Sequence, residues 1–208
     1  MKVYRIEVSS FATNCYYIVN EEAKEGIIVD PGSDVENILK MIKEAGAKCV
    51  AIFLTHGHSD HIGGLNELRE KTKAEVYVSS KDKKMLSDAR SNLSLYFGGN
   101  VKCEEPEHIL EGDAKINVAG LDFEVFATPG HTPGGICFYN KEAGMLFAGD
   151  TIFCESIGRT DFPGGSYKEI LNSIKTKILV LPEDTNILPG HGPTSTVGWE
   201  RRRNPFLQ

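Results

Sequence analysis

Five of the six histidines in this 208-residue sequence stand next to a glycine or an aspartate. Three of them lie in the stretch THGHSDH, residues 55–61, directly after the apolar run Cys49–Leu54. Side chains two residues apart in an extended segment point to the same side, so we expect His56 and His58 to face one pocket. Asp60 and His61, in the next turn, can face that pocket from another direction. Imidazole and carboxylate together suit a divalent ion such as zinc, and the motif therefore predicts a metal centre.

Three more candidate ligands follow at the ends of other apolar runs. His131 lies in the turn TPGHTPG, Asp150 ends the run Met145–Gly149, and His191 lies in the turn PGHG. A lone histidine is most often a surface residue without a role. Seven candidates at four strand ends are more than one metal ion uses, because a tetrahedral zinc site needs only three protein ligands plus water. The number of candidates therefore predicts two metal ions.

These motifs resemble those of the metallo-β-lactamase superfamily, and the resemblance covers nearly the whole chain. The strings Gly149–Thr151 and Gly158–Phe162 are most similar to the glyoxalase II-like branch and its short bacterial relatives. The resemblance implies an α/β fold, a four-layer αββα metallo-β-lactamase sandwich, formed by residues 1–208 as a single domain. It also implies the ligand sets: His56, His58 and His131 for the first ion, Asp60, His61 and His191 for the second, and Asp150 bridging both.

The chemistry of such a centre is hydrolysis. Two cations about 3.5–4 Å apart lower the pKa of a shared water from about 15.7 toward about 7, and the resulting hydroxide attacks a polarised carbonyl. Asp60 is the catalytic candidate, since it could orient the nucleophile or accept its proton. We therefore expect a binuclear metal-dependent hydrolase that cleaves a thioester such as S-2-hydroxyacylglutathione (S-lactoylglutathione). Zinc is the expected metal, with iron or manganese as alternatives.

Other functions remain open at this point. The string GRTDF also occurs in the related persulfide dioxygenases, which hold one iron, and a non-enzymatic metal-binding or redox-partner module is a third reading. A secreted β-lactamase would need an export signal, and the nuclease branch carries an inserted domain for which the chain has no room. Full-length glyoxalase II enzymes carry a C-terminal helical segment with basic glutathione-binding residues. Only about seventeen residues follow His191, so we expect weak carrier binding and tolerance of varied thioesters.

Two residues outside the ligand set are candidate substrate contacts. Arg159 could position a substrate carboxylate through a bidentate pair, although an ion pair with Asp161 is an equal alternative. Tyr167 could line the cleft or pack at the start of a helix. The segment Lys81–Asn100 could wall the site or present a buried helix face. His108 has no partner motif and is expected in an exposed loop.

Apolar runs between the motifs predict the elements that must position them. The expected strands are Val3–Val8, Cys15–Val19, Gly26–Val29, Cys49–Leu54, Ala74–Val78, Leu121–Phe126, Ile136–Tyr139, Met145–Ala148 and Thr185–Leu188. The expected helices are one capped by Asp34 and ended by Gly46, one from Asp60–His61 through Leu68, and one after Ser166. Strands that alternate with helices in this way favour layered α/β architecture.

The amino-acid composition indicates which binding partners and which cellular compartment to expect for the protein. Twenty-three basic and twenty-nine acidic residues give a net charge of −6, which argues against nucleic-acid binding. No apolar stretch approaches the ~18 residues of a membrane span. Five widely spaced cysteines without a C-x-x-C motif favour free thiols in a reducing cytoplasm. We therefore expect a cytoplasmic monomer or small homo-oligomer that binds a small-molecule thioester and neither membrane nor nucleic acid.

Overall fold

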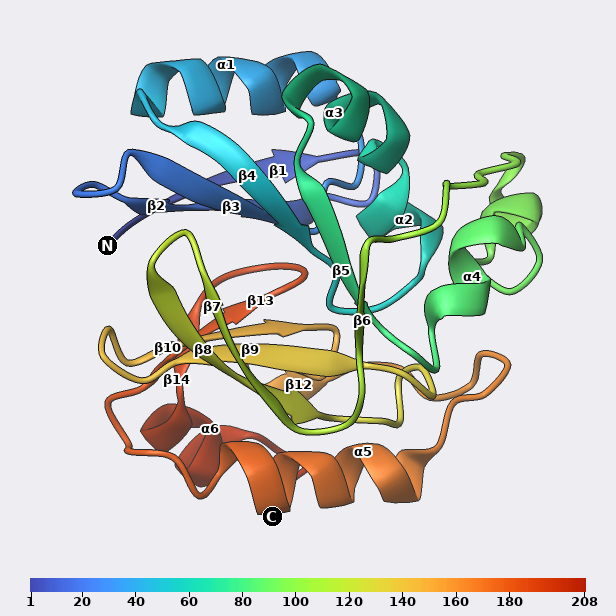
Figure 1. Cartoon of the computed structure of the whole chain (residues 1–208). Coiled ribbons are helices and arrows are strands. Elements are labelled where there is room, and N and C mark those ends of the chain that lie inside the picture. Colours follow the sequence, from blue (N-terminus) through green and yellow to red (C-terminus); the bar gives the residue numbers. More distant parts are fainter.

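Two six-stranded sheets pack against each other in the computed structural model, which describes residues 1–208 (Figure 1). The first sheet contains, in spatial order, β1 (Lys2–Val8), β2 (Thr13–Asn20), β3 (Glu25–Val29), β4 (Lys48–Phe53), β5 (Glu75–Ser79) and β6 (His108–Leu110). The second contains β14 (Ser195–Thr196), β13 (Asn186–Pro189), β10 (Met145–Gly149), β9 (Ile136–Asn140), β8 (Leu121–Ala127) and β7 (Ala114–Val118). A short ribbon of β11 (Ile152–Phe153) and β12 (Ser156–Ile157) stands apart from both sheets.

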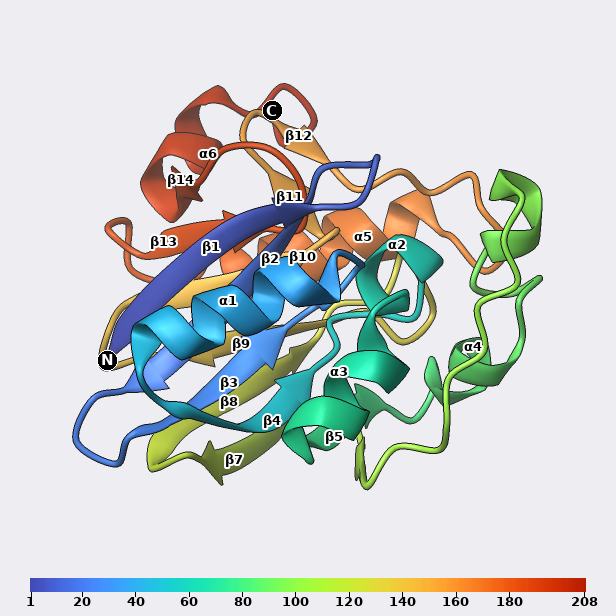
Figure 2. The ribbon, with the colours of Figure 1, turned by 90° about the horizontal axis from the view of Figure 1, so that it is seen from above.

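Helices cover the outer faces of both sheets. α1 (Val35–Ala45), α2 (Ser59–Ile62) and α3 (Leu65–Thr72) lie on the side of the first sheet, as Figure 2 shows from above. α5 (Tyr167–Ser173), its π-helical continuation η2 (Ile174–Ile178) and α6 (Val197–Arg203) lie on the side of the second (Figure 1). α4 (Lys83–Ser87) and the 3₁₀-helix η1 (Ser94–Phe97) belong to the connection between the sheets. The predicted four-layer αββα sandwich is confirmed.

The core is divided among these layers. In β2, Tyr16 and Ile18 pack between the sheets, whereas Tyr17 and Val19 pack toward α1, because successive side chains of a strand point to opposite faces. Between the sheets, Phe53 stacks on Phe138 with ring centroids 4.4 Å apart. A third apolar cluster lies beneath α5 and η2 and contains Ile170, Ile174 and Ile178. Buried strands thus hold the sheet edges, and the loops that leave them, in fixed positions.

Several expectations need correction. Asp34 stands at the N-cap position of α1, but its carboxylate accepts a hydrogen bond from the Ser9 N–H at 2.8 Å and does not cap the helix. The second expected helix is two helices, α2 and α3, with Gly63 and Gly64 between them. The five shortest or most polar strands, β6, β7, β11, β12 and β14, were not expected.

No helix combines the length and apolar character that a membrane crossing requires.

His108 is not a loop residue. It opens β6, and its ring stacks on Tyr77 with centroids 4.1 Å apart. Its Nε2 also lies 2.7 Å from a carboxylate oxygen of Glu75. Pairing with the neighbouring strand β5 gives this histidine a structural environment that its local sequence does not reveal.

Candidate metal centre

The seven predicted ligands converge at one edge of the sandwich, on loops that leave strands of both sheets. The segment after β4 carries four of them: His56 and His58 lie in the loop, and Asp60 and His61 lie in the short helix α2. His131, Asp150 and His191 follow β8, β10 and β13, all strands of the second sheet. The sequence prediction that separate strand ends meet at one site therefore agrees with where the structure places these residues.

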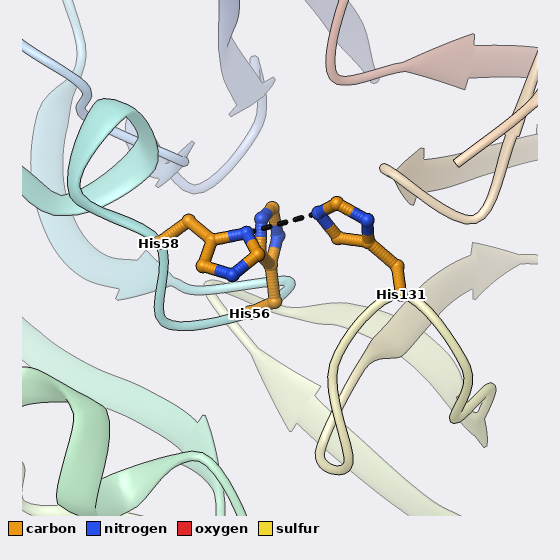
Figure 3. Close-up of side chains that lie close together, drawn as sticks. All are labelled: His56, His58 and His131. Carbon is orange, nitrogen blue, oxygen red and sulfur yellow. Dashed lines mark hydrogen bonds between the residues drawn. The ribbon is translucent and has the colours of Figure 1, made fainter. Parts of the chain in front are cut away.

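Three imidazoles form the first group of candidate ligands. His56, His58 and His131 are buried, and their rings point toward one another in Figure 3. His58 Nδ1 lies 2.9 Å from His131 Nε2. His131 Nδ1 donates a hydrogen bond to the backbone carbonyl of Arg159 at 2.8 Å, which leaves Nε2 as the nitrogen that faces the group. Such a carbonyl partner fixes the tautomer and orientation of a metal-binding histidine.

The second group contains Asp60, His61 and His191. The Nε2 atoms of His61 and His191 lie 3.3 Å apart, and the latter lies 3.2 Å from Asp60 Oδ2. The outer nitrogens are occupied: His61 Nδ1 donates to Asp30 Oδ2 at 2.9 Å, and His191 Nδ1 donates to the Phe11 carbonyl at 3.1 Å. Both inner nitrogens are therefore aimed at the same space as the Asp60 carboxylate.

Asp150 lies between the two groups. Its Oδ2 is 3.5 Å from His131 Nε2 in the first group and 3.6 Å from His191 Nε2 in the second. Its Oδ1 is buried without a hydrogen-bond partner, as is His56 Nε2. A buried polar atom left without a partner costs about 1–3 kcal/mol, and a cation among these residues would remove that cost. The residues present fit a metal centre.

Burial and charge divide the histidines into two kinds. Burial, followed by repulsion from His61, holds the pKa of His56 well below its ordinary value. Burial, followed by the neighbouring His131, does the same to the pKa of His58. These two rings are therefore neutral at physiological pH. Neutral imidazole is the form that binds a metal.

In the second group, the neighbouring carboxylates raise the pKa of histidine instead of lowering it. Burial acts to lower the pKa of His61, but three surrounding carboxylates, those of Asp60, Asp150 and Asp30, outweigh it and raise that pKa to about 10. Burial likewise opposes ionisation of Asp60, yet His61 and His191 hold its pKa below the ordinary value. Without a metal, this half of the centre balances its carboxylates with a protonated imidazole.

Asp30 is a site residue that the sequence analysis missed. It directly follows β3 and accepts hydrogen bonds from the Thr55 N–H at 2.8 Å and the Thr55 hydroxyl at 2.6 Å, besides the one from His61. It also lies close enough to His56 and His61 to form a third group of possible ligands. Its signal was visible as an apolar strand, GIIVD, that ends in aspartate.

Asp82 is the second missed residue. Its buried carboxylate accepts hydrogen bonds from the Gly57 N–H at 3.1 Å, the Thr132 hydroxyl at 2.7 Å and the Gly134 N–H at 2.7 Å. Burial raises its pKa, and the three donors act against that rise. Asp82 thus joins the loop of His56 and His58 to the loop of His131. No local pattern marks it in the sequence.

A glycine allows the loops to approach this closely. A Cβ on Gly190 would lie 2.2 Å from Asp150 Oδ1 and 2.7 Å from His61 Cε1. Any side chain at this position would therefore displace the residues that link the two groups.

A cavity of about 350 Å³ opens over both groups. Its walls are largely apolar and include four phenylalanines: Phe11, Phe97, Phe153 and Phe162. Five of the candidate ligands form its polar floor: His58, Asp60, His131, Asp150 and His191. The space therefore offers an apolar enclosure for a small molecule whose reactive group reaches the ligands.

Of the two predicted substrate contacts, only one lines the cavity. Arg159 does, but its guanidinium is paired with both oxygens of Asp161, at 2.8 and 2.7 Å, and lies 4.0 Å over the ring of Phe162. The alternative expectation of an ion pair is the one that the structure contains. Tyr167 opens α5 as an exposed side chain and is absent from the cavity wall, because α5 buries its opposite side through Ile170.

Comparison with known proteins agrees with this geometry. Residues 9–195 match the family described as the metallo-beta-lactamase superfamily. The probable metallo-hydrolase YqgX of Bacillus subtilis is 41% identical over 208 residues, covering 100% of this chain and 98% of its own. The hydroxyacylglutathione hydrolase GloC of Haemophilus influenzae is 37% identical over 209 residues, covering 100% of this chain and 98% of its own.

Two solved structures are also similar. The BLEG-1 B3 metallo-beta-lactamase superposes with a TM-score of 0.96 and 38% identity, covering 100% of both chains. TTHA1623 in a di-iron-bound form superposes with a TM-score of 0.87 and 33% identity, covering 98% of this chain and 100% of its own. Fold, histidine motif and sequence relatives lead to one conclusion: this chain belongs to the metallo-β-lactamase superfamily.

Proposed function

We propose that the protein is a hydrolase that cleaves thioesters of 2-hydroxy acids, with S-lactoylglutathione as the reference substrate, at a centre of two divalent ions. The observation that carries this proposal is the pair of three-ligand groups with Asp150 between them, at the floor of one cavity. The likeness to GloC supports the thioester substrate, because that relative is a hydroxyacylglutathione hydrolase.

The ligand assignment follows the two groups. His56, His58 and His131 would hold the first ion, Asp60, His61 and His191 the second, and Asp150 would contact both. Zinc is the proposed metal, with iron supported by the di-iron form of TTHA1623 and manganese as a further alternative. When bound, such ions lower the pKa of water toward about 7 and polarise a carbonyl.

The chain's own residues then prepare the reaction. Asp60 lines the cavity, is ionised at neutral pH, and can orient the attacking water and take its proton on the carboxylate. Its Oδ2 lies 3.2 Å from His191 Nε2, within the same group of candidate ligands. Phe153 and Phe162 line the cavity and would exclude bulk water from an acyl group bound there. Arg159 could reach a substrate carboxylate only by giving up its pair with Asp161.

Metal content and turnover test the proposal together. We expect two ions per chain, and zinc-loaded protein should release thiol from S-lactoylglutathione without oxygen. The main alternative is a mononuclear iron dioxygenase that acts on a persulfide. One ion per chain, with oxygen uptake on glutathione persulfide and no thioester cleavage in any metal form, would establish that alternative. Two bound ions without any turnover would instead favour a non-enzymatic metal-binding or redox-partner module.

A second hydrolytic substrate has a specific observation in its favour. BLEG-1 is described as a B3 metallo-beta-lactamase, and its likeness to this chain extends over its full length. A chromogenic cephalosporin assayed beside S-lactoylglutathione distinguishes the two substrates, and we expect the thioester to have the higher kcat/KM. The five free cysteines further support our proposal that the protein works in the reducing cytoplasm.

A further inference from the structure

A second hollow lies beside the metal cavity and shares part of its wall. It measures about 520 Å³, and we call it the serine groove. Residues that line it include Ser10, Ser33, Asp34, Ser59 and Gly99. It is thus built from the β1–β2 turn, the loop before α1, the start of α2 and the segment after η1.

Two phenylalanines separate the groove from the cavity. Phe11 and Phe97 line both hollows, and their rings meet edge to face with centroids 5.1 Å apart. They remain 45% and 55% exposed, so nothing else covers this contact. The candidate ligand Asp60 is the third residue common to both hollows. A carbonyl placed near Asp60 could therefore extend an acyl group into the cavity and a thiol arm into the groove.

The groove is rich in uncommitted hydroxyl groups. The hydroxyls of Ser10, Ser33 and Ser59 make no hydrogen bond within the protein, although other serines of the chain do. A hydroxyl both donates and accepts, so a row of them can bind the N–H and the C=O of an amide equally well. A ligand arm that carries amides would find partners along the groove.

The charge of the serine groove acts against an anionic arm. No lysine or arginine lines the serine groove, and its ionisable residues are Asp34 and Asp60. Apart from the candidate metal ligands, the cavity contains one basic side chain, Arg159, and Asp161 already holds it by two hydrogen bonds. A glutathione arm brings two carboxylates and one ammonium, a net negative charge, and its carboxylates would find no free cation in the groove beside Asp34.

We propose that the serine groove binds the thiol half of the substrate, and that this half is an uncharged, amide-bearing arm of the pantetheine type. The inference rests on the proposed thioester hydrolysis and names its carrier. The acyl half then occupies the phenylalanine-walled cavity. Glutathione thioesters become substrates that react at the same centre but bind poorly.

Three lactoyl thioesters test the carrier. S-lactoylpantetheine has the full neutral arm, S-lactoyl-N-acetylcysteamine has a truncated neutral arm, and S-lactoylglutathione has the charged one. We expect kcat/KM to be highest for the pantetheine thioester, by roughly tenfold over glutathione, because like charges in contact disfavour the latter. Added salt should narrow that difference, since it screens repulsion and leaves a neutral arm unaffected.

A conservative variant tests the groove itself. Asp34→Asn removes the negative charge, while its amide oxygen can still accept the Ser9 N–H and asparagine tolerates the left-handed backbone at φ 54°. We expect kcat/KM for the glutathione thioester to rise about threefold relative to the pantetheine thioester. Asp184→Asn is the matched control, because Asp184 is exposed and lines neither hollow.

The outcomes separate the inference from the function on which it rests. A preference for pantetheine that Asp34→Asn narrows and Asp184→Asn does not would support the serine groove as the carrier site. Cleavage of the glutathione thioester with equal or higher kcat/KM would overturn the inference and leave thioester hydrolysis standing. Absence of thiol release from all three substrates, with both ions bound, would overturn the proposed function and the inference with it.

Discussion

Replacement of Asp82 by asparagine should loosen the first ligand group without touching any ligand. The carboxylate accepts three hydrogen bonds, from Gly57, Thr132 and Gly134, whereas an amide offers one accepting oxygen and one donating NH₂. The Thr132 hydroxyl can turn to accept from that NH₂. One of the two glycine N–H groups then faces a donor, whichever way the amide is placed.

The magnitude follows from this count. A buried N–H that loses its acceptor costs about 1–3 kcal/mol. Part of this is returned, because burial raises the pKa of Asp82 and a neutral amide escapes the cost of burying a charge. We therefore expect the free energy of unfolding to fall by about 2 kcal/mol, which lowers Tm by about 4–8 °C for a domain of this size. The looser loops should weaken metal binding about 10- to 100-fold.

Two measurements check the reasoning. Thermal unfolding of the metal-free protein gives the stability change, and titration with zinc gives the affinity of each site. The affinity for the ion proposed to bind His56, His58 and His131 should fall, because Asp82 accepts hydrogen bonds from the loops that carry these residues. Asp184→Asn serves as control and should stay within about 0.5 kcal/mol of the wild type. An Asp82→Asn protein with unchanged Tm and unchanged zinc affinity would refute the proposed anchoring role.

Three further predictions concern the centre itself. Asp150→Asn should weaken metal retention, measured by elemental analysis, and lower turnover at least ~10²-fold; near-normal activity with both ions bound would contradict a bridging role. Gly190→Ala should reduce metal retention, because the new methyl would lie 2.2 Å from Asp150 Oδ1, whereas Gly99→Ala, whose nearest neighbour is 3.5 Å away, should retain metal normally. Metal binding at pH 8 should release about one proton from His61, because its pKa of about 10 keeps it charged in the metal-free protein, and metal affinity should rise with pH up to that value. Calorimetry in buffers of different ionisation enthalpy measures the proton release. No release is expected if His61 has an ordinary pKa.

Most of the fold could be predicted from the sequence, because most of its strands are strongly apolar. Each expected strand corresponds to an observed one, usually within one or two residues, since runs such as Gly26–Val29 are buried on both faces. β6, with three residues, and β14, with two, are too short to show a pattern. β7, with the sequence AKINV, alternates apolar and polar side chains and could have been predicted from that alternation, but it was not among the expected strands.

The candidate site was predictable to the extent that it is local. The THGHSDH stretch predicts four candidate ligands by its spacing. Asp30 and Asp82 act through hydrogen bonds to residues 25 positions or more away in the chain, and such contacts depend on which strands become neighbours. The strand order of the second sheet, in which β10 pairs with β13, could not be obtained from periodicity. The choice between the two positions expected for Tyr167, in the cleft or at the start of a helix, was open for a related reason, since the direction of α5 decides which of its sides is buried.

The division of the candidate ligands between the two sheets also predicts an order of events during synthesis and folding. His61 and His191 are 130 residues apart in the sequence, so closing that loop costs about 4 kcal/mol in chain entropy. Partial ligand sets on a growing polypeptide cannot recover this cost until both sheets have packed. Metal ions should therefore be acquired after folding and stabilise the finished structure by mass action. Under metal scarcity, the cell would accumulate a folded reserve that regains its ions without refolding.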